Sequence, residues 1–332
     1  MNTTTPHAHE LAAQATALRL KNFPIAWFAV IMGLAGLTLA WARTERLFRL
    51  DLAISPWLAA LTGLVFVLLA GVYTLKVIRH ADAVSAEFAH PVKLAFAPTV
   101  SIALILLASV TQSGLPGLSW WLWSVGAALH LILTLYVLSA WMHRGGFEPA
   151  HLNPAWFIPV VGNILVPIAG VNHAPADLSW FFFSLGLFFW PVLSALLFYR
   201  LIFHPALPER LLPTLFIFIA PPAVGFIAYY SLVGEVDAFA RILYFVALAF
   251  SLILFSQSRH VLRRRFFLSW WAYAFPLAAI TLATLIMAED SGLAFYHRLG
   301  ALLLAILTLV IAGLAARTAV AVVRREICVQ DG

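Results

Sequence analysis

The feature that most constrains the fold of this chain is a series of long apolar runs, each of the length of a membrane-spanning helix. About 20 apolar residues form a helix that crosses the roughly 30 Å hydrocarbon core of a bilayer. Of the 332 residues, 63% are hydrophobic and 10% are charged, whereas a soluble domain carries about 25% charged residues. Ten runs match the required length: 23–42, 57–79, 93–112, 117–142, 155–171, 178–203, 212–232, 236–258, 268–289 and 293–316.

These runs predict helices rather than strands. Backbone N–H and C=O groups cannot stay unpaired in lipid, so a spanning segment must be a helix or part of a closed barrel. A membrane barrel needs strands of about ten residues with alternating polarity, whereas the runs here are continuously apolar. The expected fold class is therefore an all-α integral membrane protein with ten transmembrane helices.

The ends of the chain are expected to be short and polar. Residues 1–22 lack an apolar core followed by a small-residue cleavage site, so they predict a cytoplasmic lead rather than a secretory signal. Residues 23–323 are expected to form a single transmembrane domain whose last helix extends beyond the membrane, and 324–332 a short cytoplasmic tail. Cys328 is the one cysteine of the sequence, which excludes an internal disulfide and a cysteine metal framework. No metal or cofactor is expected.

The basic residues predict the orientation. Ten spans place both termini on one side, and 15 of the 20 Lys and Arg residues fall on that side, including the run at 263–265. Because short loops rich in Lys and Arg stay in the cytoplasm, both termini are expected inside a bacterial-type inner (plasma) membrane. The net charge of +6 follows from this flanking pattern, so nucleic acid is not an expected partner. The other five basic residues lie outside: Arg43, Arg46, Arg49, Arg241 and Arg298.

Prolines divide the spans into two kinds. Only Pro191 lies inside an even-numbered span, whereas the odd-numbered spans hold most of the others. Bent backbone at membrane depth is tolerated where it is buried in protein or lines a wet cavity. Prolines and glycines are common in membrane helices generally, but this does not explain the odd–even bias. The prolines in or at the start of odd spans are Pro24, Pro98, Pro159, Pro167, Pro213, Pro221, Pro222 and Pro276.

The spacing of the odd spans adds a loose internal repeat. They begin near residues 23, 93, 155, 212 and 268, and each is joined to the next even span by a mostly short loop. This pattern is typical of repeated units. We therefore expect five helical hairpins, with an inner ring of five bent odd helices around a pore and an outer ring of five even helices.

Few ionisable residues fall deep inside a span, which limits the chemistry. A central histidine, His130, is predicted to hydrogen-bond to a neighbouring helix, with proton coupling as the alternative. One central histidine does not supply the ligand pair of a haem enzyme, and Ser101 has no evident histidine or acid partner nearby in the sequence for a hydrolase. An enzyme is therefore not expected. At the cytoplasmic mouth, His90 and Lys93 are expected to raise the local concentration of anions.

Five segments of the odd spans carry a resemblance to a known family. They are FPIAWFAVIMGLAGLTLAW at 23–41, HPVKLAFAPTVSIALILLA at 90–108, NPAWFIPVVGNILVPIAG at 153–170, APPAVGFIAY at 220–229 and SWWAYAFPLAAITLAT at 269–284. Together they resemble the tellurite-resistance/dicarboxylate transporter family, which includes bacterial TehA and the plant guard-cell slow anion channels. The resemblance covers nearly the whole chain after about residue 20.

The resemblance implies a central pore in each protomer of a homotrimer, with anions as the transported partners. It also implies that Phe275, on the ninth helix, is a phenylalanine that blocks the pore. We therefore expect an anion channel for chloride-like or nitrate-like ions. The alternative is a proton-coupled or facilitated exporter of weak-acid anions such as a malate-like dicarboxylate, sulfite or tellurite. From their positions in the odd spans, further lining or kink residues are expected to be Pro276, Gly33, Gly36, Phe96, Pro98, Phe157, Gly162, Pro222 and Gly225.

Overall fold

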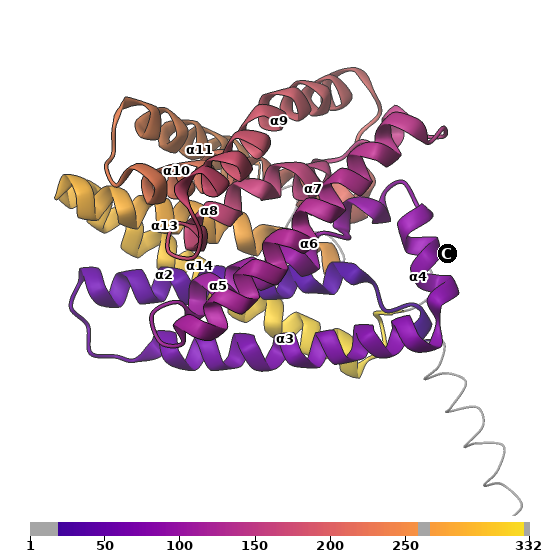
Figure 1. Ribbon diagram of the computed structural model, residues 1–332, viewed down its shortest axis with the longest axis horizontal. Helices are drawn as coiled ribbons and strands as arrows, with labels where there is room; N and C mark the ends of the chain where they lie inside the picture. The colour runs from indigo at the N-terminus through magenta and orange to yellow at the C-terminus, as the bar shows by residue number, and fades with distance from the viewer. Residues whose placement is uncertain (1–18, 258–265, 329–332) are drawn as a thin grey trace, which may run out of the picture.

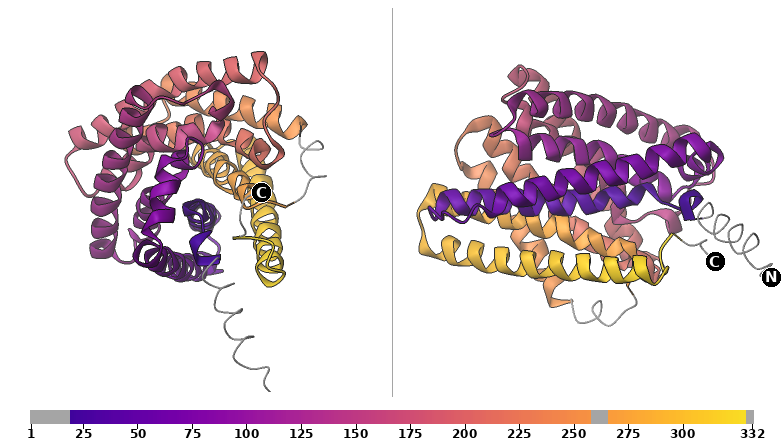
Figure 2. Two further views of the ribbon diagram at one scale, coloured as in Figure 1. Left: turned by 90° about the vertical axis from the view of Figure 1, so that its right-hand side faces the viewer. Right: turned by 90° about the horizontal axis from the view of Figure 1, so that it is seen from below.

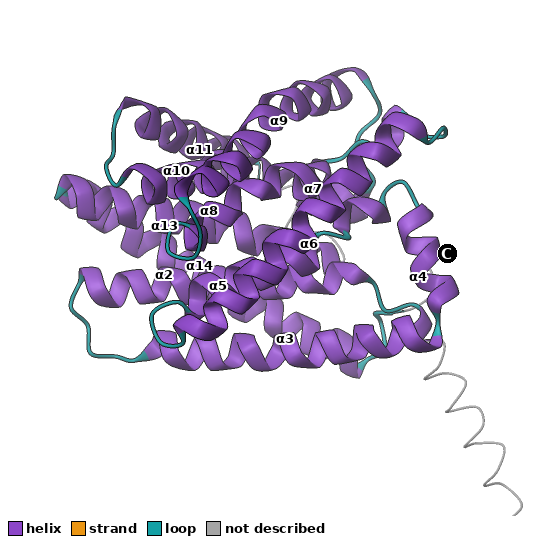
Figure 3. Cartoon of the chain, in the orientation of Figure 1, coloured by secondary structure: helices purple, strands orange, loops and turns teal. Residues whose placement is uncertain are grey.

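The fold of this chain, in a computed structural model, is all-helical, as the sequence predicts (Figures 1 and 3). The structure describes residues 19–257 and 266–328, and within these ranges no strand is present. The basic run 263–265 and most of the expected lead 1–22 lie outside the described residues. The long helices run side by side along one axis, and the start of α2 and the end of α14 lie at the same end of the molecule (Figure 2).

Nine helices in the described part of the chain are long and apolar enough to cross a membrane. The fifth predicted span forms a shorter apolar segment, Pro154–Gly170. A short helix that the sequence did not predict, α4 (Ala81–Ala89), follows the second span. The even-numbered spans are α3 (Ile54–Arg79), α6 (Pro116–His143), α9 (Ala176–Phe203), α11 (Ala238–Ser256) and α14 (Ala294–Val323).

The odd-numbered spans are interrupted helices. Each combines 3-10 turns, marked η, with an α-helix, in five sets: η1 (Ile25–Trp27) with α2 (Phe28–Leu47); η2 (Lys93–Phe96) with α5 (Thr99–Thr111); η4 (Pro154–Trp156), α7 (Phe157–Val161), η5 (Gly162–Leu165) and α8 (Val166–Gly170); η6 (Glu209–Ile219) with α10 (Ala220–Val233); and η7 (Leu268–Tyr273) with α13 (Ala274–Ser291). A further 3-10 turn, η3 (Pro149–His151), precedes the third set.

Proline explains where the α-helices begin. The first four N–H groups of an α-helix have no partner within the helix, so a proline in the first turn costs no hydrogen bond. Pro221 and Pro222 occupy the first turn of α10, and Pro276 is the third residue of α13. Pro276 therefore marks the start of an α-helix, rather than a kink inside one.

Burial separates the two kinds of span. In the four long odd-numbered spans, 67% to 83% of the residues in the 18-residue apolar window are buried within the chain. In the even-numbered spans, this share is 6% to 33%. Large apolar side chains such as Trp57 and Leu309 are 79% and 73% exposed on the even helices. Such surfaces suit lipid or another protein subunit, because exposed apolar area of this extent is unfavourable in water.

A buried ion pair joins the first span to its neighbours. The Lys76 and Glu87 side chains are only 2% and 9% exposed, and Lys76 Nζ lies 2.8 Å from Glu87 Oε2. Lys76 also donates to the Phe23 carbonyl at 2.8 Å, and the Tyr73 hydroxyl donates to Glu87 Oε2 at 3.1 Å. The Ile25 N–H donates to Glu87 Oε1 at 3.3 Å. These bonds connect α3, α4 and the start of the first span.

Candidate functional site

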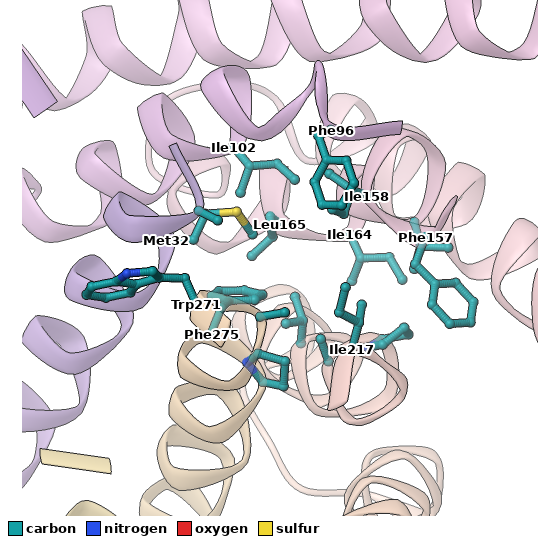
Figure 4. Close-up of a pocket in the computed structure, with 18 residues that line it drawn as sticks. Met32, Phe96, Ile102, Phe157, Ile158, Ile164, Leu165, Ile217, Trp271 and Phe275 are labelled. Carbon is teal, nitrogen blue, oxygen red and sulfur yellow. The ribbon is translucent and has the colours of Figure 1, made fainter. Parts of the chain in front are cut away.

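An apolar cavity lies among the odd-numbered spans. Its volume is about 70 Å³, and its wall receives side chains from all five of these spans. None of the described residues that line it is ionisable. The wall residues, most of which Figure 4 labels, are Ala29, Met32, Phe96, Ile102, Phe157, Ile158, Val161, Gly162, Ile164, Leu165, Ile217, Ala220, Pro221, Val224, Trp271, Ala272, Phe275 and Pro276.

A second, smaller cavity of about 20 Å³ follows the first toward the end of the molecule at which α2 and α13 terminate. Phe275, Leu165 and Val224 line both cavities, so these three side chains lie between them. Figure 4 shows the Phe275 ring extending from α13 toward Met32 and Leu165. Phe275 therefore lies where the two apolar spaces adjoin.

The start of α13 explains how Phe275 comes to face this space. Ala274 and Pro276 on either side of it are buried, whereas Phe275 is only partly buried. Because Pro276 fixes its own φ and cannot donate, α13 begins here, and the preceding residues Leu268–Tyr273 form a 3-10 turn. The change of helix type places Trp271, Ala272 and Phe275 together on the cavity wall.

The other candidate residues divide into two groups. Phe96, Phe157, Gly162 and Pro276 line the first cavity with Phe275, and Gly36 lines the second. The remaining candidates lie outside both walls. They are Gly33, which packs on Ala274 and Trp271; Gly225, which faces Leu243 of α11; Pro98, which precedes α5; and Pro222, whose neighbour Pro221 lines the wall instead.

The contact between α2 and α13 holds the Phe275 segment in place. A Cβ atom added to Gly33 would lie 2.6 Å from Ala274 Cβ, and one added to Gly36 would lie 2.6 Å from Ala278 Cβ. Real Cβ atoms do not approach this closely, so only glycine permits this spacing of the two helices. Because Ala274 and Ala278 flank Phe275, this small-residue contact fixes the backbone that carries the ring.

We therefore expect Gly36→Ala to destabilise the protein by about 1–3 kcal/mol, the usual cost of an extra methyl group in a packed core. Thermal melting of the purified protein in detergent measures the change. Gly313→Ala on α14 is the matched control, because nothing lies within 4 Å of the added atom. Equal melting temperatures for the two variants would show that α2 and α13 do not pack in this way.

His130 lies behind the cavity wall within a buried polar cluster. Its Nδ1 atom is 2.9 Å from Ser101 Oγ on α5, which is the predicted hydrogen bond to a neighbouring helix. Ser101 has no histidine nearby in the sequence, as expected, because the two residues are 29 positions apart and meet only in the folded chain. A Cβ atom added to Gly162 would lie 2.8 Å from His130 Nε2, so the histidine packs directly on a wall residue.

The same cluster continues along the third odd span. Asn163 donates to Thr134 Oγ1 at 3.0 Å and to the Val160 carbonyl at 2.7 Å. Thr134 in turn donates to the Pro159 carbonyl at 2.6 Å. Carbonyls released by the break between α7 and η5 are thus satisfied by side chains, as an interrupted membrane helix requires.

The predicted mouth residues lie at the opposite end from the second cavity. His90 and Lys93 are both exposed, and they lie in the turn between α4 and Phe96, which lines the first cavity. The His90 ring nitrogen Nδ1 accepts from the Val92 N–H at 3.1 Å and the Lys93 N–H at 3.3 Å. Neither residue is among the described residues that line these two cavities.

Comparison with known proteins identifies the family of this architecture. The model of the voltage-dependent anion channel family, SLAC1, matches residues 22–319. The chain belongs to this family. The match covers every apolar span, so the resemblance that the five odd segments suggest is confirmed.

Several curated members of this family are similar over most of the chain. The S-type anion channel SLAH3 of Arabidopsis thaliana is 28% identical over 94% of this chain and 50% of its own length. The guard cell S-type anion channel SLAC1 of the same plant is 29% identical over 81% of this chain and 50% of its own length. The tellurite resistance protein TehA homolog of Haemophilus influenzae is 28% identical over 83% of each chain. The chain thus spans about half the length of its plant relatives.

Several wall residues were not among the sequence candidates. Ile102, Ile158, Ile217 and Trp271 line the first cavity. In an odd span that is apolar on all sides, the hydrophobic pattern does not distinguish the face toward the cavity from the face toward other helices. The available signal was indirect, since each lies in or next to a segment where the helix type changes.

Proposed function

We propose that this protein is an anion channel in which the five odd-numbered spans surround a path for small anions and Phe275 closes it. The observation that carries this proposal is that all five odd spans line one cavity, and that Phe275 lies between this cavity and the next. An apolar ring at a constriction blocks hydrated ions by its size and by excluding water. The even helices would then form the outer layer, in keeping with their exposed apolar surfaces.

The cavity wall supports the passage of anions although none of its described residues carries a charge. The first-turn residues Ala29, Phe157, Ala220 and Phe275 belong to four different α-helices, and all four line the cavity. The N-terminal end of a helix carries a partial positive charge, which favours a nearby anion. The 3-10 turns before these helices form hydrogen bonds with some of these N–H groups. The partial positive charge is therefore spread along the wall and does not form a tight anion-binding site.

The exposed apolar surface and the positions of the basic residues support a homotrimer in a plasma membrane with both termini inside. Only 6% of the residues in the apolar window of α3 are buried within the chain, a smaller share than in any other described span. Part of this apolar face would be covered by a neighbouring protomer and the rest by lipid. The orientation follows from the basic residues at the end that holds the start of α2 and the end of α14.

A coupled exporter of weak-acid anions is the second candidate function. The observation that favours it is the polar cluster of His130, Ser101, Thr134 and Asn163, which adjoins the cavity wall at Gly162. A histidine in such a position is able to exchange a proton with a transported acid.

A flux assay separates the two functions. Proteoliposomes loaded with chloride, nitrate or malate are given a pH step at fixed membrane potential, and then a potential step at fixed pH. A channel is expected to follow the potential and to show no uphill accumulation driven by the pH step. Accumulation that requires the pH step, and that His130→Gln abolishes, would establish the exporter instead.

A further inference from the structure

Three side chains meet at the end of the helices that surround the second cavity. Arg43 near the end of α2 pairs with Glu289 near the end of α13, with 2.6 Å between Arg43 Nη2 and Glu289 Oε2. The Arg43 guanidinium carbon also lies 5.9 Å from the centre of the Tyr230 ring on α10. The three helices that contribute most to the second cavity are thus bridged at one point.

The helical repeat places these side chains over the cavity. Residues three, four or seven positions apart share one face of an α-helix. Leu39, Ile227 and Leu282 line the second cavity, and they precede Arg43, Tyr230 and Glu289 by four, three and seven residues, respectively. The cluster therefore lies one to two turns beyond the cavity on the faces that line it.

Arg43 retains hydrogen-bonding capacity in this position. Its side chain is 19% exposed and that of Glu289 is 50% exposed, so the carboxylate lies on the outer side of the pair. Arg43 Nε is buried and has no hydrogen-bond partner among the described residues. Glu45, another carboxylate near this end of α2, instead accepts the Ile54 N–H at the start of α3.

We propose that Arg43 is an anion-binding residue at the outer mouth of the path, and that Glu289 is a built-in competitor for it. The inference rests on the proposed channel function, because it places the site on the path that Phe275 closes. A guanidinium binds carboxylates and other oxyanions through paired N–H donors. When a small monovalent anion reaches the mouth, it replaces the Glu289 carboxylate, which swings outward into solvent, and Tyr230 keeps the guanidinium in place through its ring.

This exchange sets the affinity of the outer mouth for anions and how readily anions enter from the outside. With Glu289 in place, its carboxylate offsets the Arg43 charge, and the pair attracts few anions from the outside. Without the carboxylate, the unpaired Arg43 charge in a narrow opening raises the local anion concentration, an effect of about tenfold or more in charged clefts. Glu289 therefore acts through Arg43, and removal of Glu289 should have no effect once Arg43 is neutralised.

Two measurements test the proposal on the full-length protein. The first is thermal melting in detergent over a nitrate titration, with gluconate keeping the ionic strength constant. Anion binding to the folded state stabilises it by RT ln(1 + [L]/Kd), so the melting temperature begins to rise when the anion concentration reaches the Kd. Glu289→Gln is expected to lower the nitrate concentration at which the melting temperature begins to rise by about tenfold. The Arg43→Gln variant and the Arg43→Gln/Glu289→Gln double variant are both expected to lose this nitrate-dependent stabilisation, and to the same extent.

The second measurement is anion current in planar bilayers, with each variant placed in the Phe275→Ala background. Glu289→Gln is expected to raise the current carried by anions from the outer side at low concentration by about tenfold. Arg43→Gln is expected to reduce it, with or without Glu289→Gln. Arg241→Gln is the control, since this exposed arginine at the start of α11 lies outside the cluster, and it should leave both measurements unchanged.

The outcomes separate the site from the channel. Nitrate titrations that are the same in Glu289→Gln, Arg43→Gln and Arg241→Gln would overturn the site, as would additive effects in the double variant. If Phe275→Ala carries no current while the nitrate titrations shift as expected, the site stands and the channel function fails.

Discussion

Phe275→Ala is expected to raise the anion current of this protein in planar bilayers by at least about tenfold, which corresponds to about 1.4 kcal/mol removed from the barrier to permeation. The ring lies between two cavities, and it is the largest of the three side chains that line both. Its removal joins the two spaces, and the apolar constriction becomes wide enough to hold water.

Graded substitutions test whether the ring acts by its volume. Phe275→Leu keeps an apolar side chain of smaller size and is expected to give a current between those of wild type and Phe275→Ala. Phe245→Ala removes the same ring from α11, where the side chain is 48% exposed on the outer surface, and should leave the current unchanged. A correctly assembled Phe275→Ala protein with wild-type current would show that Phe275 is an ordinary packing residue.

Glu87→Gln is expected to destabilise the protein by about 3–5 kcal/mol, which is the typical cost of removing one partner of a buried ion pair. Lys76 Nζ then loses its counter-charge in a position where its side chain is only 2% exposed. The free energy of unfolding, or the melting temperature in detergent, measures this loss. The start of the first span should loosen as well, because Glu87 Oε1 accepts the Ile25 N–H.

A second pair in the same region provides the control. Lys21 and Asp82 also lie 2.8 Å apart, but their side chains are 45% and 67% exposed. Exposed pairs contribute little because water and salt screen the charges, so Asp82→Asn should change stability little. In the double variant Lys76→Met/Glu87→Gln, much of the lost stability should return, because no unpaired charge remains buried. A Glu87→Gln protein as stable as Asp82→Asn would contradict the ion pair.

The sequence predicted the membrane class and the spans well because both depend on local composition. Long apolar runs leave few alternatives in lipid, and the prolines marked the interrupted spans correctly. The predicted extension of the last helix to about residue 323 is confirmed by α14, which ends at Val323. The fifth span was the hardest case, because two prolines divide it into segments of three to five residues.

The contacts between spans could not be predicted from local patterns in the sequence. Lys76 reads as one of the basic residues that flank a span, but its side chain turns inward to meet Glu87 on a helix that the sequence did not predict. The pairing of Ser101 with His130, and that of Arg43 with Glu289, likewise joins positions far apart in the chain. Such pairs depend on the rotation of each helix about its axis, which a uniformly apolar span does not specify.

The close packing of α2 against α13 limits the motions available to the proposed Phe275 gate. Gly33 and Gly36 hold Ala274 and Ala278 at a spacing that leaves no room for the α13 backbone to slide or tilt toward α2. Opening is therefore expected to come from rotation of the Phe275 side chain into one of the adjoining spaces. Side-chain rotations take picoseconds to nanoseconds, and collective helix motions take microseconds to milliseconds. Single-channel records should then show a reduced average current level rather than separate long openings and closures.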